Sequence, residues 1–553
     1  MIRFDNFSFG HPQKDLYENI NFEINAGDHA VLIGSNGSGK TTLVNLIMNE
    51  EKYTYDGLIR MDKNIRIGYV SQFVEHETSE LTTVDFLAAP FKAMIQKSDD
   101  LCAKMAESEN LDAVYEEYQK VVDEIETVDA YNYESNIGKE LAVAGLSDLA
   151  DIPVTNLSGG EYKLLFIMRN MLLKPQLLIM DEPDVFLDFE NLIALIKLIN
   201  NHDGTLLTIT HNRLLLTQCF DKVLDIENKS VREFPGNFAE YNSWMLENKI
   251  EIFEHARDFD EFIEKQEQLV KNIRKLAESI AEPRFGRQLR ARATYMERLR
   301  KMRGEDPFIE NHDHEFHLAF KDVAEDTSEA VDEASDMEEK PEEIVTAAEI
   351  AVNHYSLAYG DRKILENVSF TVKPGEKIAI VGTNGTGKSS MLRDIYADLE
   401  EKMPGKIGYF RQIVESDHEL KLSGGERNIA QIEMLCKTPH TGLLLDEPTS
   451  HLDIYAQIEL EKAVREYEGT VILVSHDLFA ITACADRILM IEDGTIREMS
   501  GRAYRKSIYK KYFASDIFEA ERKRIETEIK VSNLIRAGKY DAARKVLGTE
   551  KED

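Results

Sequence analysis

A short phosphate-binding pattern, G-x-x-x-x-G-K-[ST], occurs twice in this sequence and constrains the fold more than any other feature. The first copy follows the apolar, strand-like residues 29–33 and precedes a helical pattern, which is the setting that the motif requires. Such a loop surrounds phosphate oxygens with backbone N–H groups, while its lysine adds positive charge and its final hydroxyl can bind Mg²⁺. The two loops consist of Gly34, Ser35, Asn36, Gly37, Ser38, Gly39, Lys40, Thr41 and Thr42, and of Gly382, Thr383, Asn384, Gly385, Thr386, Gly387, Lys388, Ser389 and Ser390.

The motifs that follow the two loops have identical spacings. The serine of L-S-G-G-E, here called the signature, lies 24 positions before the glutamate of D-E-P in both halves (158 to 182 and 423 to 447). This glutamate lies 29 positions before a histidine in both halves (182 to 211 and 447 to 476). Chance does not produce such agreement, so the halves are two copies of one domain. We therefore predict an α/β fold with two tandem P-loop domains.

Polar residues end three strand-like runs in each half. They are Gln72, Asp181, Glu182 and His211 in the first half, and Gln412, Asp446, Glu447 and His476 in the second. Folds of the α/β class place ligands at the carboxyl edge of a parallel sheet, where these residues would meet. Each signature also opens a helix whose glycine-lined N-terminus attracts anions, and we expect Ser158 to be the N-cap of the first. The signature residues are Ser158, Gly159 and Gly160, and Ser423, Gly424 and Gly425. Taken singly, each residue type is more often structural, but their joint order beside a P-loop indicates a nucleotide site.

This series of motifs resembles that of the ATP-binding cassette (ABC) ATPases. The resemblance implies that each cassette binds ATP and Mg²⁺, and that Glu182 and Glu447 polarise the attacking water. It implies that His211 and His476 contact the γ-phosphate, and that the metal is held through Thr41, Ser389, Gln72, Gln412, Asp181 and Asp446. Phe9 and Tyr359 would stack on adenine, although a place in the apolar core is an equal alternative for Phe9.

The same resemblance implies that each ATP lies between one P-loop and the opposite signature. The first site would join the first P-loop with Ser423 and Gly425, and the second site would join the second P-loop with Ser158 and Gly160. The loop after the glutamate reads P-T-S-H-L-D at residues 448–453 but P-D-V-F-L-D at residues 183–188, where soluble cassette ATPases usually have P-T-N-H-L-D. From the intact loop of the second half and the complete first cassette, we expect the second site to be the more orthodox.

The two cassettes differ in the length of their helical subdomains. From the glutamine to the signature serine there are 86 positions in the first half (72 to 158) but only 11 in the second (412 to 423). We expect a helical subdomain at about residues 75–155 of the first cassette and a reduced one in the second. The predicted domains are a first cassette (1–237), a helical hairpin linker with a basic tip and an acidic connector (238–345), a second cassette (346–500) and a basic, aromatic helical extension (501–553).

The linker carries a concentrated positive charge. Residues 271–303 hold eleven Lys or Arg against three Glu, in a chain whose formal net charge is −35. A solvated coiled coil would mix the two signs, whereas here the arginines crowd the tip of the hairpin. Because arginine binds phosphates in a bidentate manner and stacks on bases, we predict RNA contact through Arg284, Arg287, Arg290, Arg292, Arg298 and Arg300.

Bulk composition limits the remaining possibilities. The acidic sequence pI of about 4.9 argues against general nucleic-acid binding, so any such contact must be local. No apolar run approaches the roughly 18–20 residues that span a bilayer, and the N-terminus has no signal pattern, so we expect a cytoplasmic protein without a membrane partner. The four scattered cysteines are predicted to be ordinary reduced thiols.

Two cassettes, no membrane segment and a basic hairpin between them resemble the ABC-F family of translation-associated ATPases. The resemblance implies ATP hydrolysis, binding to the ribosome near rRNA and peptidyl-tRNA, and a monomer whose two cassettes pair within one chain. Some members of the family displace antibiotics and others regulate elongation. Two alternatives from other classes are the ATPase subunit of a transporter and a nucleotide-gated scaffold with little turnover.

Overall fold

The computed structural model of the chain describes residues 1–11, 14–63, 65–72, 74, 80–105, 111–279, 316–319, 349–360, 362–412, 424–492, 494–513 and 517–548. Ser423 and the six arginines predicted to contact RNA lie outside these ranges. The two halves of the described chain are mixed α/β domains built on six-stranded sheets, as the repeated motifs predict.

The first cassette is centred on a sheet in the order β5-β6-β7-β3-β8-β9. Its members are β5 (Ile67–Val70), β6 (Leu177–Asp181), β7 (Thr205–Ile209), β3 (His29–Gly34), β8 (Lys222–Glu227) and β9 (Ser230–Pro235). All neighbours pair in parallel except β8 and β9. Every position of β6 and β7 is buried, as expected for parallel strands covered on both faces. The carboxyl ends of β3, β6 and β7 therefore meet at one edge.

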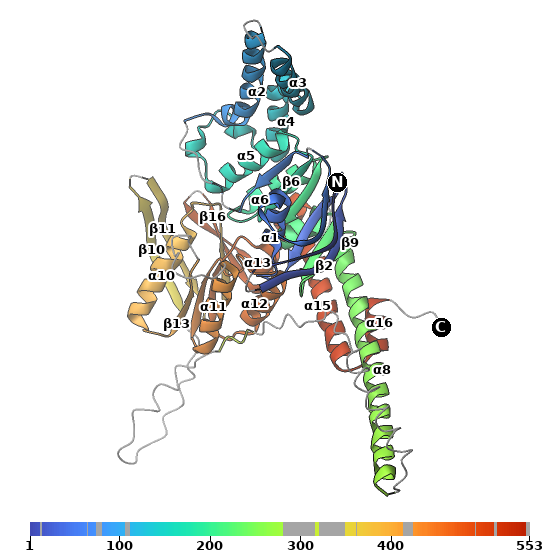
Figure 1. Ribbon diagram of the computed structural model, residues 1–553. Helices are drawn as coiled ribbons and strands as arrows, with labels where there is room; N and C mark the ends of the chain where they lie inside the picture. Colours follow the sequence, from blue (N-terminus) through green and yellow to red (C-terminus); the bar gives the residue numbers. More distant parts are fainter. Residues whose placement is uncertain are drawn as a thin grey trace.

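A second, antiparallel sheet and several helices complete this cassette. The sheet has the order β2-β1-β4 and consists of β1 (Ile2–His11), β2 (Lys14–Ile24) and β4 (Asp56–Met61). The helices of the nucleotide-binding part are α1 (Lys40–Met48), η1 (Glu50–Lys52), α5 (Gly159–Leu172), α6 (Phe189–Asn200) and α7 (Arg213–Gln218). The expected helical subdomain contains α2 (Thr83–Met105), α3 (Leu111–Val128), η2 (Ala130–Asn132), α4 (Tyr133–Ala144), η3 (Ser147–Leu149) and η4 (Val154–Asn156), and it projects as an arm in Figure 1.

The second cassette repeats this plan with fewer helices in the described ranges. Its six-stranded sheet runs β13-β14-β15-β12-β16-β17, and β10 and β11 form a separate pair. These strands are β10 (Ile350–Tyr359), β11 (Arg362–Val372), β12 (Lys377–Val381), β13 (Ile407–Phe410), β14 (Gly442–Asp446), β15 (Thr470–Val474), β16 (Arg487–Glu492) and β17 (Thr495–Ser500). Its helices are α10 (Lys388–Lys402), α11 (Gly424–Lys437), α12 (Ile454–Glu466) and α13 (Leu478–Cys484).

One continuous apolar core joins the two cassettes. A single cluster of buried side chains includes Leu192 and Leu215 from the first cassette together with Leu452 and Phe479 from the second. The cassettes are therefore packed against each other, and sites formed between them are part of the folded structure. All four cysteines are free thiols, which confirms the prediction from their spacing.

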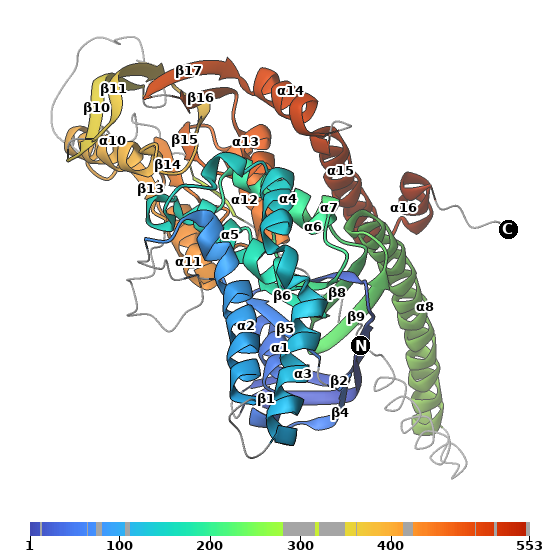
Figure 2. The same ribbon diagram turned by 90° about the horizontal axis from the view of Figure 1, so that it is seen from above.

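A long helix leaves the first cassette directly after β9. Helix α8 (Phe238–Ser279) has 42 residues, about 63 Å at the α-helical rise per residue, which confirms the helix predicted from residue 238 onward. It extends well beyond the cassettes, while α15 (Ile517–Arg536) and α16 (Tyr540–Leu547) lie along its first part (Figures 1 and 2). Helix α14 (Gly501–Tyr512) connects these C-terminal helices to β17. Within the described ranges, no helix is both long and apolar enough to cross a membrane.

Candidate active site

Each P-loop connects the central strand of its sheet to a helix. The first loop runs from β3 to α1, where Gly39 has a φ of 108° and a Cβ at this position would lie 2.6 Å from the Tyr17 hydroxyl. Glycine is therefore required here by both backbone and space. The ammonium of Lys40 donates to the carbonyl oxygens of Gly34 (2.9 Å) and Ser35 (3.0 Å).

The second P-loop has the same internal geometry. Lys388 donates to the carbonyl oxygens of Gly382 (2.8 Å) and Thr383 (2.9 Å), and Gly387 also has a positive φ. Burial lowers the pKa of both P-loop lysines. The buried hydroxyl of Ser38 has no hydrogen-bond partner within the described part of the chain. Two lysines that bind only loop carbonyls and an unpaired buried hydroxyl fit a loop that is built to receive phosphate oxygens.

A hydroxyl and a carboxylate face each other beside each P-loop. Ser389 donates to Asp446 Oδ1 at 2.9 Å, and the Thr41 hydroxyl bonds Asp181 in the first half. Burial and the charge of Glu182 raise the pKa of Asp181 to about 6, and burial also raises that of Asp446. Among the described residues no group of three or more His, Cys, Asp or Glu converges as a metal site. A few oxygen donors beside a phosphate loop are what Mg²⁺ needs, because substrate phosphates and water supply its other ligands.

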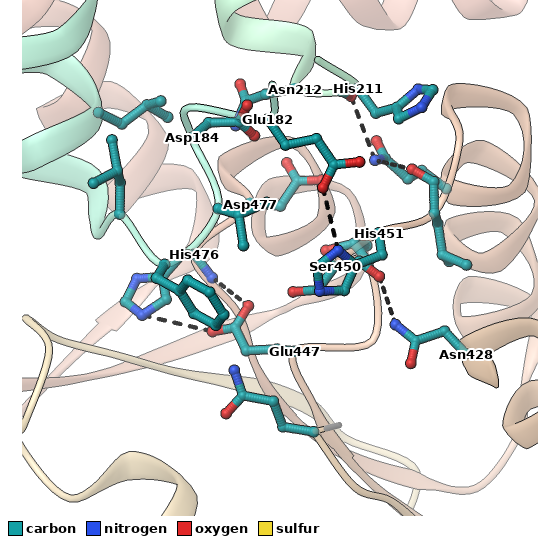
Figure 3. Close-up of a pocket in the computed structure, with 18 residues that line it drawn as sticks. Glu182, Asp184, His211, Asn212, Asn428, Glu447, Ser450, His451, His476 and Asp477 are labelled. Atoms are coloured by element: carbon teal, nitrogen blue, oxygen red, sulfur yellow. Dashed lines mark hydrogen bonds and ion pairs between the residues drawn. The ribbon is translucent and has the colours of Figure 1, made fainter. Parts of the chain in front are cut away.

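Glu182 contacts residues from both cassettes. It follows the end of β6 with a φ of 46°, and its Oε2 accepts a hydrogen bond from Gln72 Nε2 at 2.5 Å. The same oxygen lies 3.3 Å from Nδ1 of His451, which belongs to the second cassette (Figure 3). Burial alone would raise the pKa of Glu182, but the His451 hydrogen bond and the electrostatic attraction of His211, His451 and Lys40 outweigh burial and lower the pKa.

Glu447 has different surroundings in the second half. It also has a positive φ of 51°, and it accepts a hydrogen bond from the backbone N–H of His476 at 3.2 Å. Its Oε1 lies 3.6 Å from His476 Nε2 (Figure 3). Burial raises the pKa of Glu447 to about 8 and lowers that of His476 to about 3. Glu447 is therefore paired within its own cassette, whereas Glu182 is paired across the interface.

The two signatures lie against the opposite P-loops. A Cβ at Gly160 would lie 3.5 Å from Nδ2 of Asn384, and a Cβ at Gly425 would overlap Nδ2 of Asn36. Ser158 caps α5 in a capping box with Glu161, which confirms its prediction as an N-cap residue. A cavity of about 470 Å³ joins Gly159, Gly160 and Phe186 of the first cassette to the second P-loop, Gln412, Glu447 and His476. Of the residues predicted for the second site, this cavity is lined by Gly160, Lys388, Ser389, Gln412, Glu447 and His476.

The remaining predicted residues occupy varied environments. His211 is buried, burial and Lys40 lower its pKa to about 4, and neither ring nitrogen has a hydrogen-bond partner in the described part of the chain. A buried, neutral histidine without a partner fits a group whose ring nitrogen forms a hydrogen bond with a phosphate oxygen when nucleotide is bound. Phe9 is only 8 % exposed and packs edge-on against Tyr53, so the structure favours the core alternative over adenine stacking. Tyr359 ends β10, opposite Arg362.

The post-glutamate loops cross the interface, which corrects an inference from the sequence. The sequence alone favours assigning the intact residues 448–453 to the second site, because they follow Glu447. The structure places His451 against Glu182 and Gln72 of the first site, and Phe186 in the cavity of the second. The altered loop, residues 183–188, therefore belongs to the second site. The intact loop belongs to the first site, so it does not support the expectation that the second site is the more orthodox.

Sequence reasoning missed Lys163, a buried lysine on α5. Its ammonium donates to the carbonyl oxygens of Gln72 (3.0 Å), Glu182 (2.8 Å) and Val185 (3.1 Å). Burial lowers its pKa to about 8. Lys163 thus ties the signature helix to the segments that carry the glutamine and the glutamate. Its position, five residues after Ser158, carries no signal by itself because lysines on helices usually face water.

Comparisons with known proteins show what the chain is similar to. The profile of the family described as ABC transporter matches residues 17–185 and 365–421. The chain is 26% identical over 556 residues to ABC transporter F family member 5 of Arabidopsis thaliana, covering 90% of this chain and 76% of that protein. It is 25% identical to the Uncharacterized ABC transporter ATP-binding protein YfmM of Bacillus subtilis (strain 168), covering 85% of this chain and 94% of that one.

The match to a third relative extends over nearly the whole length of both chains. The chain is 24% identical over 567 residues to the Energy-dependent translational throttle protein EttA of Escherichia coli (strain K12), covering 92% of this chain and 96% of that protein. Among solved structures, the complex of archaeal ribosomal stalk protein aP1 and archaeal ribosome recycling factor aABCE1 is 16% identical, covers 89% of each chain and has a TM-score of 0.44.

Proposed function

We propose that the chain is a member of the ABC-F family of twin-cassette ATPases, and that it binds the ribosome and acts on translation through its linker. Hydrolysis of ATP follows from the family and from the two composite sites. The name of the relative from E. coli describes a translational throttle, and similarity along nearly both full chains supports a role of this class here.

One observation supports closure of the two cassettes on nucleotide: each P-loop forms a hydrogen bond with the post-glutamate loop of the other cassette. Asn36 Nδ2 donates to the carbonyl oxygen of His451, and Asn384 Nδ2 donates to that of Phe186, both at 2.9 Å. Nucleotide in either site would therefore touch both cassettes and stabilise their closed pairing. We propose that the chain is a monomer whose cassettes close on two ATP molecules, with domains at 1–237, 238–345, 346–500 and 501–553.

The proposed chemistry is positioning and electrostatic stabilisation. Glu182 and Glu447 orient the attacking water, while Lys40, Lys388 and the N–H groups of the P-loops stabilise charge on the phosphate. Mg²⁺, held beside Thr41 with Asp181 and beside Ser389 with Asp446, would supply positive charge to the β- and γ-phosphates. We assign phosphate contact to His211 and His476, and nucleotide contact in trans to the signatures at Ser158 and Ser423.

The linker is the proposed effector. Helix α8 begins directly after β9 of the first cassette and extends away from both cassettes, so movement of the cassette would be transmitted to its far end (Figure 1). In the sequence this helix leads to the arginine-rich residues 284–300, which lie outside the described ranges. We propose that Arg284, Arg287, Arg290, Arg292, Arg298 and Arg300 contact ribosomal RNA or peptidyl-tRNA.

A trapped variant tests this function. Glu182→Gln combined with Glu447→Gln should keep ATP bound and unhydrolysed, so that the chain co-sediments with ribosomes in a sucrose gradient with ATP. Lys40→Ala with Lys388→Ala is the control that loses nucleotide binding and should remain at the top. Absence of the trapped variant from the ribosome fractions would contradict the proposal, and recovery of a membrane permease with it would favour the transporter alternative.

A second measurement addresses the role in translation. Growth with and without the gene across a panel of ribosome-targeting antibiotics distinguishes drug displacement from regulation of elongation. Replacing the six arginines of the tip by glutamine should abolish either effect while ATP hydrolysis by the purified chain persists. Loss of hydrolysis in that variant would instead indicate that the linker acts on the cassettes.

A further inference from the structure

Phe186 and His451 occupy equivalent backbone positions across the cassette interface. Each lies four residues after its glutamate, and each has a positive φ, 68° for Phe186 and 59° for His451. The carbonyl oxygen of each accepts a hydrogen bond from the asparagine of the opposite P-loop, at 2.9 Å in both cases. The backbones of the two loops are thus bound alike, and what differs is the side chain that each presents to the opposite site.

His451 connects the polar groups of the first site. Its Nδ1 lies 3.3 Å from Glu182 Oε2 (Figure 3) and 3.2 Å from Gln72 Nε2. Protonated at Nδ1, the ring donates to Glu182; protonated only at Nε2, it accepts from Gln72. In either tautomer the imidazole restrains the two side chains that would align water at the first P-loop.

Phe186 provides nothing equivalent at the second site. A phenyl ring can neither donate nor accept a conventional hydrogen bond. Phe186 is 47 % exposed and lines the cavity that also contains Lys388, Gln412 and Glu447. Glu447 Oε1 has no hydrogen-bond partner among the described residues. The second site therefore places an apolar surface where the first site has an imidazole.

A bulky residue with a positive φ is unusual, and it persists only where its surroundings hold it there. Phe186 is held because its carbonyl oxygen binds Asn384, and because the next-but-one residue, Asp188, accepts from the backbone N–H of Asn384 at 3.1 Å and caps α6. The loop thus keeps its contact with the second P-loop although its side chain has changed. The cassettes therefore remain docked at the second site, but Glu447 has no imidazole equivalent to that of His451 beside it.

We propose that His451 and Phe186 make the two ATP sites unequal, so that the first site hydrolyses ATP rapidly and the second holds it. His451 is a positioning residue that acts through Glu182 and Gln72 across the interface. Phe186 leaves Glu447 and the attacking water without that support, so ATP at the second site stabilises the closed cassettes through several turnovers of the first. This inference rests on the assignment of Glu182 and Glu447 as catalytic carboxylates in the proposed function.

The test follows the conversion of bound ATP in the full-length chain. With two ATP per chain and Mg²⁺, wild-type protein should form ADP in two phases of equal size, the slower by about tenfold or more. Phe186→His should merge them into one fast phase. Phe186→Asn is the second variant, because asparagine tolerates a positive φ and supplies a polar group. Equal rates at both sites in the wild-type chain, or an unchanged slow phase in both folded variants, would overturn the inference.

The reciprocal variant tests the first site. His451→Phe should slow the fast phase by about tenfold or more, with a KM for ATP changed by less than about threefold, because docking through the backbone carbonyl remains. His451→Asn should restore most of the rate. A His451→Phe chain that hydrolyses at the wild-type rate would overturn the inference. Residual hydrolysis in the double Glu182→Gln, Glu447→Gln chain would instead overturn the catalytic assignments.

Discussion

Arg213 of the first cassette forms a buried ion pair with Glu461 of the second, and the same guanidinium lies 3.2 Å from Asp477 Oδ2. The side chains of Arg213 and Glu461 are 1 % and 5 % exposed. Arg213 also lies over the ring of Phe479, 4.8 Å from its centroid. Because Asp477 directly follows His476, this pair links the histidine segment of the first cassette to that of the second.

The pair occurs on one side of the interface only. At the offset of 265 residues that relates Glu182 to Glu447, Arg213 corresponds to Leu478 and Glu461 to Ile196, and both counterparts are buried apolar residues. The protein therefore contains its own apolar version of this contact. Leucine at position 213 and isoleucine at position 461 would therefore replace the ion pair by the residues found at the equivalent positions.

We predict that Arg213→Leu alone will be strongly destabilising. It leaves Glu461 buried without its partner, which typically costs about 3–5 kcal/mol. The double variant Arg213→Leu, Glu461→Ile removes both charges and should recover most of the loss. The thermal unfolding midpoint of the full chain measures both effects. A single variant that melts with the wild-type chain would show that the pair does not stabilise the docked cassettes.

Lys163 provides a second prediction, about activity. Lys163→Met should remove three hydrogen bonds to the carbonyl oxygens of Gln72, Glu182 and Val185. Because these hold the segments that position the glutamine and the glutamate, we expect kcat to fall by about tenfold or more with a smaller change in KM. Steady-state phosphate release measures both constants.

The second cassette supplies the matched control for Lys163. Its counterpart is Asn428, whose Nδ2 donates to the carbonyl oxygen of Ser450, the residue equivalent to Val185. Lys163→Asn should therefore keep one of the three contacts and lose less activity than Lys163→Met. Equal activity of wild-type chain and Lys163→Met would rule out a positioning role.

The elements that the sequence predicts well are those specified by local patterns. The P-loops, the strands that end in Asp181 and Asp446, and α8 each follow from a short motif or from a long stretch without Gly or Pro. Their chemistry and structure are determined by residues that are neighbours along the chain. Ser158 as an N-cap is of the same kind.

The contacts between cassettes could not be predicted in this way. Arg213 and Glu461 are 248 positions apart, and nothing near either residue marks it as part of a pair. The assignment of the intact loop to its own site failed for the same reason, since a sequence pattern does not show which way a loop crosses an interface. Phe9 was ambiguous because an aromatic residue on a strand suits both a core and a ligand.

A third prediction concerns the attachment of α8 to the C-terminal helices. Leu246 and Ile250 of α8 share a buried cluster with Val531, Ile535, Tyr540 and Ala543 of α15 and α16. Arg544 forms an ion pair with Glu254 beside this cluster, and their side chains are 9 % and 23 % exposed. The C-terminal helices therefore pack against the first part of α8, beside which they lie in Figure 2.

Arg544→Ala should loosen the base of α8 without touching the ATP sites. Losing a partly buried, charged hydrogen bond costs about 1.5–3 kcal/mol, so amide hydrogen exchange near Glu254 should rise by about tenfold or more, while ATP hydrolysis is unchanged. The exchanged pair Glu254→Arg, Arg544→Glu should restore protection, and Lys363→Ala, which removes an exposed pair with Glu366, is the control. Unchanged exchange in Arg544→Ala would mean that the apolar cluster alone fixes α8, and then Ile250→Ala, not Arg544→Ala, would release it.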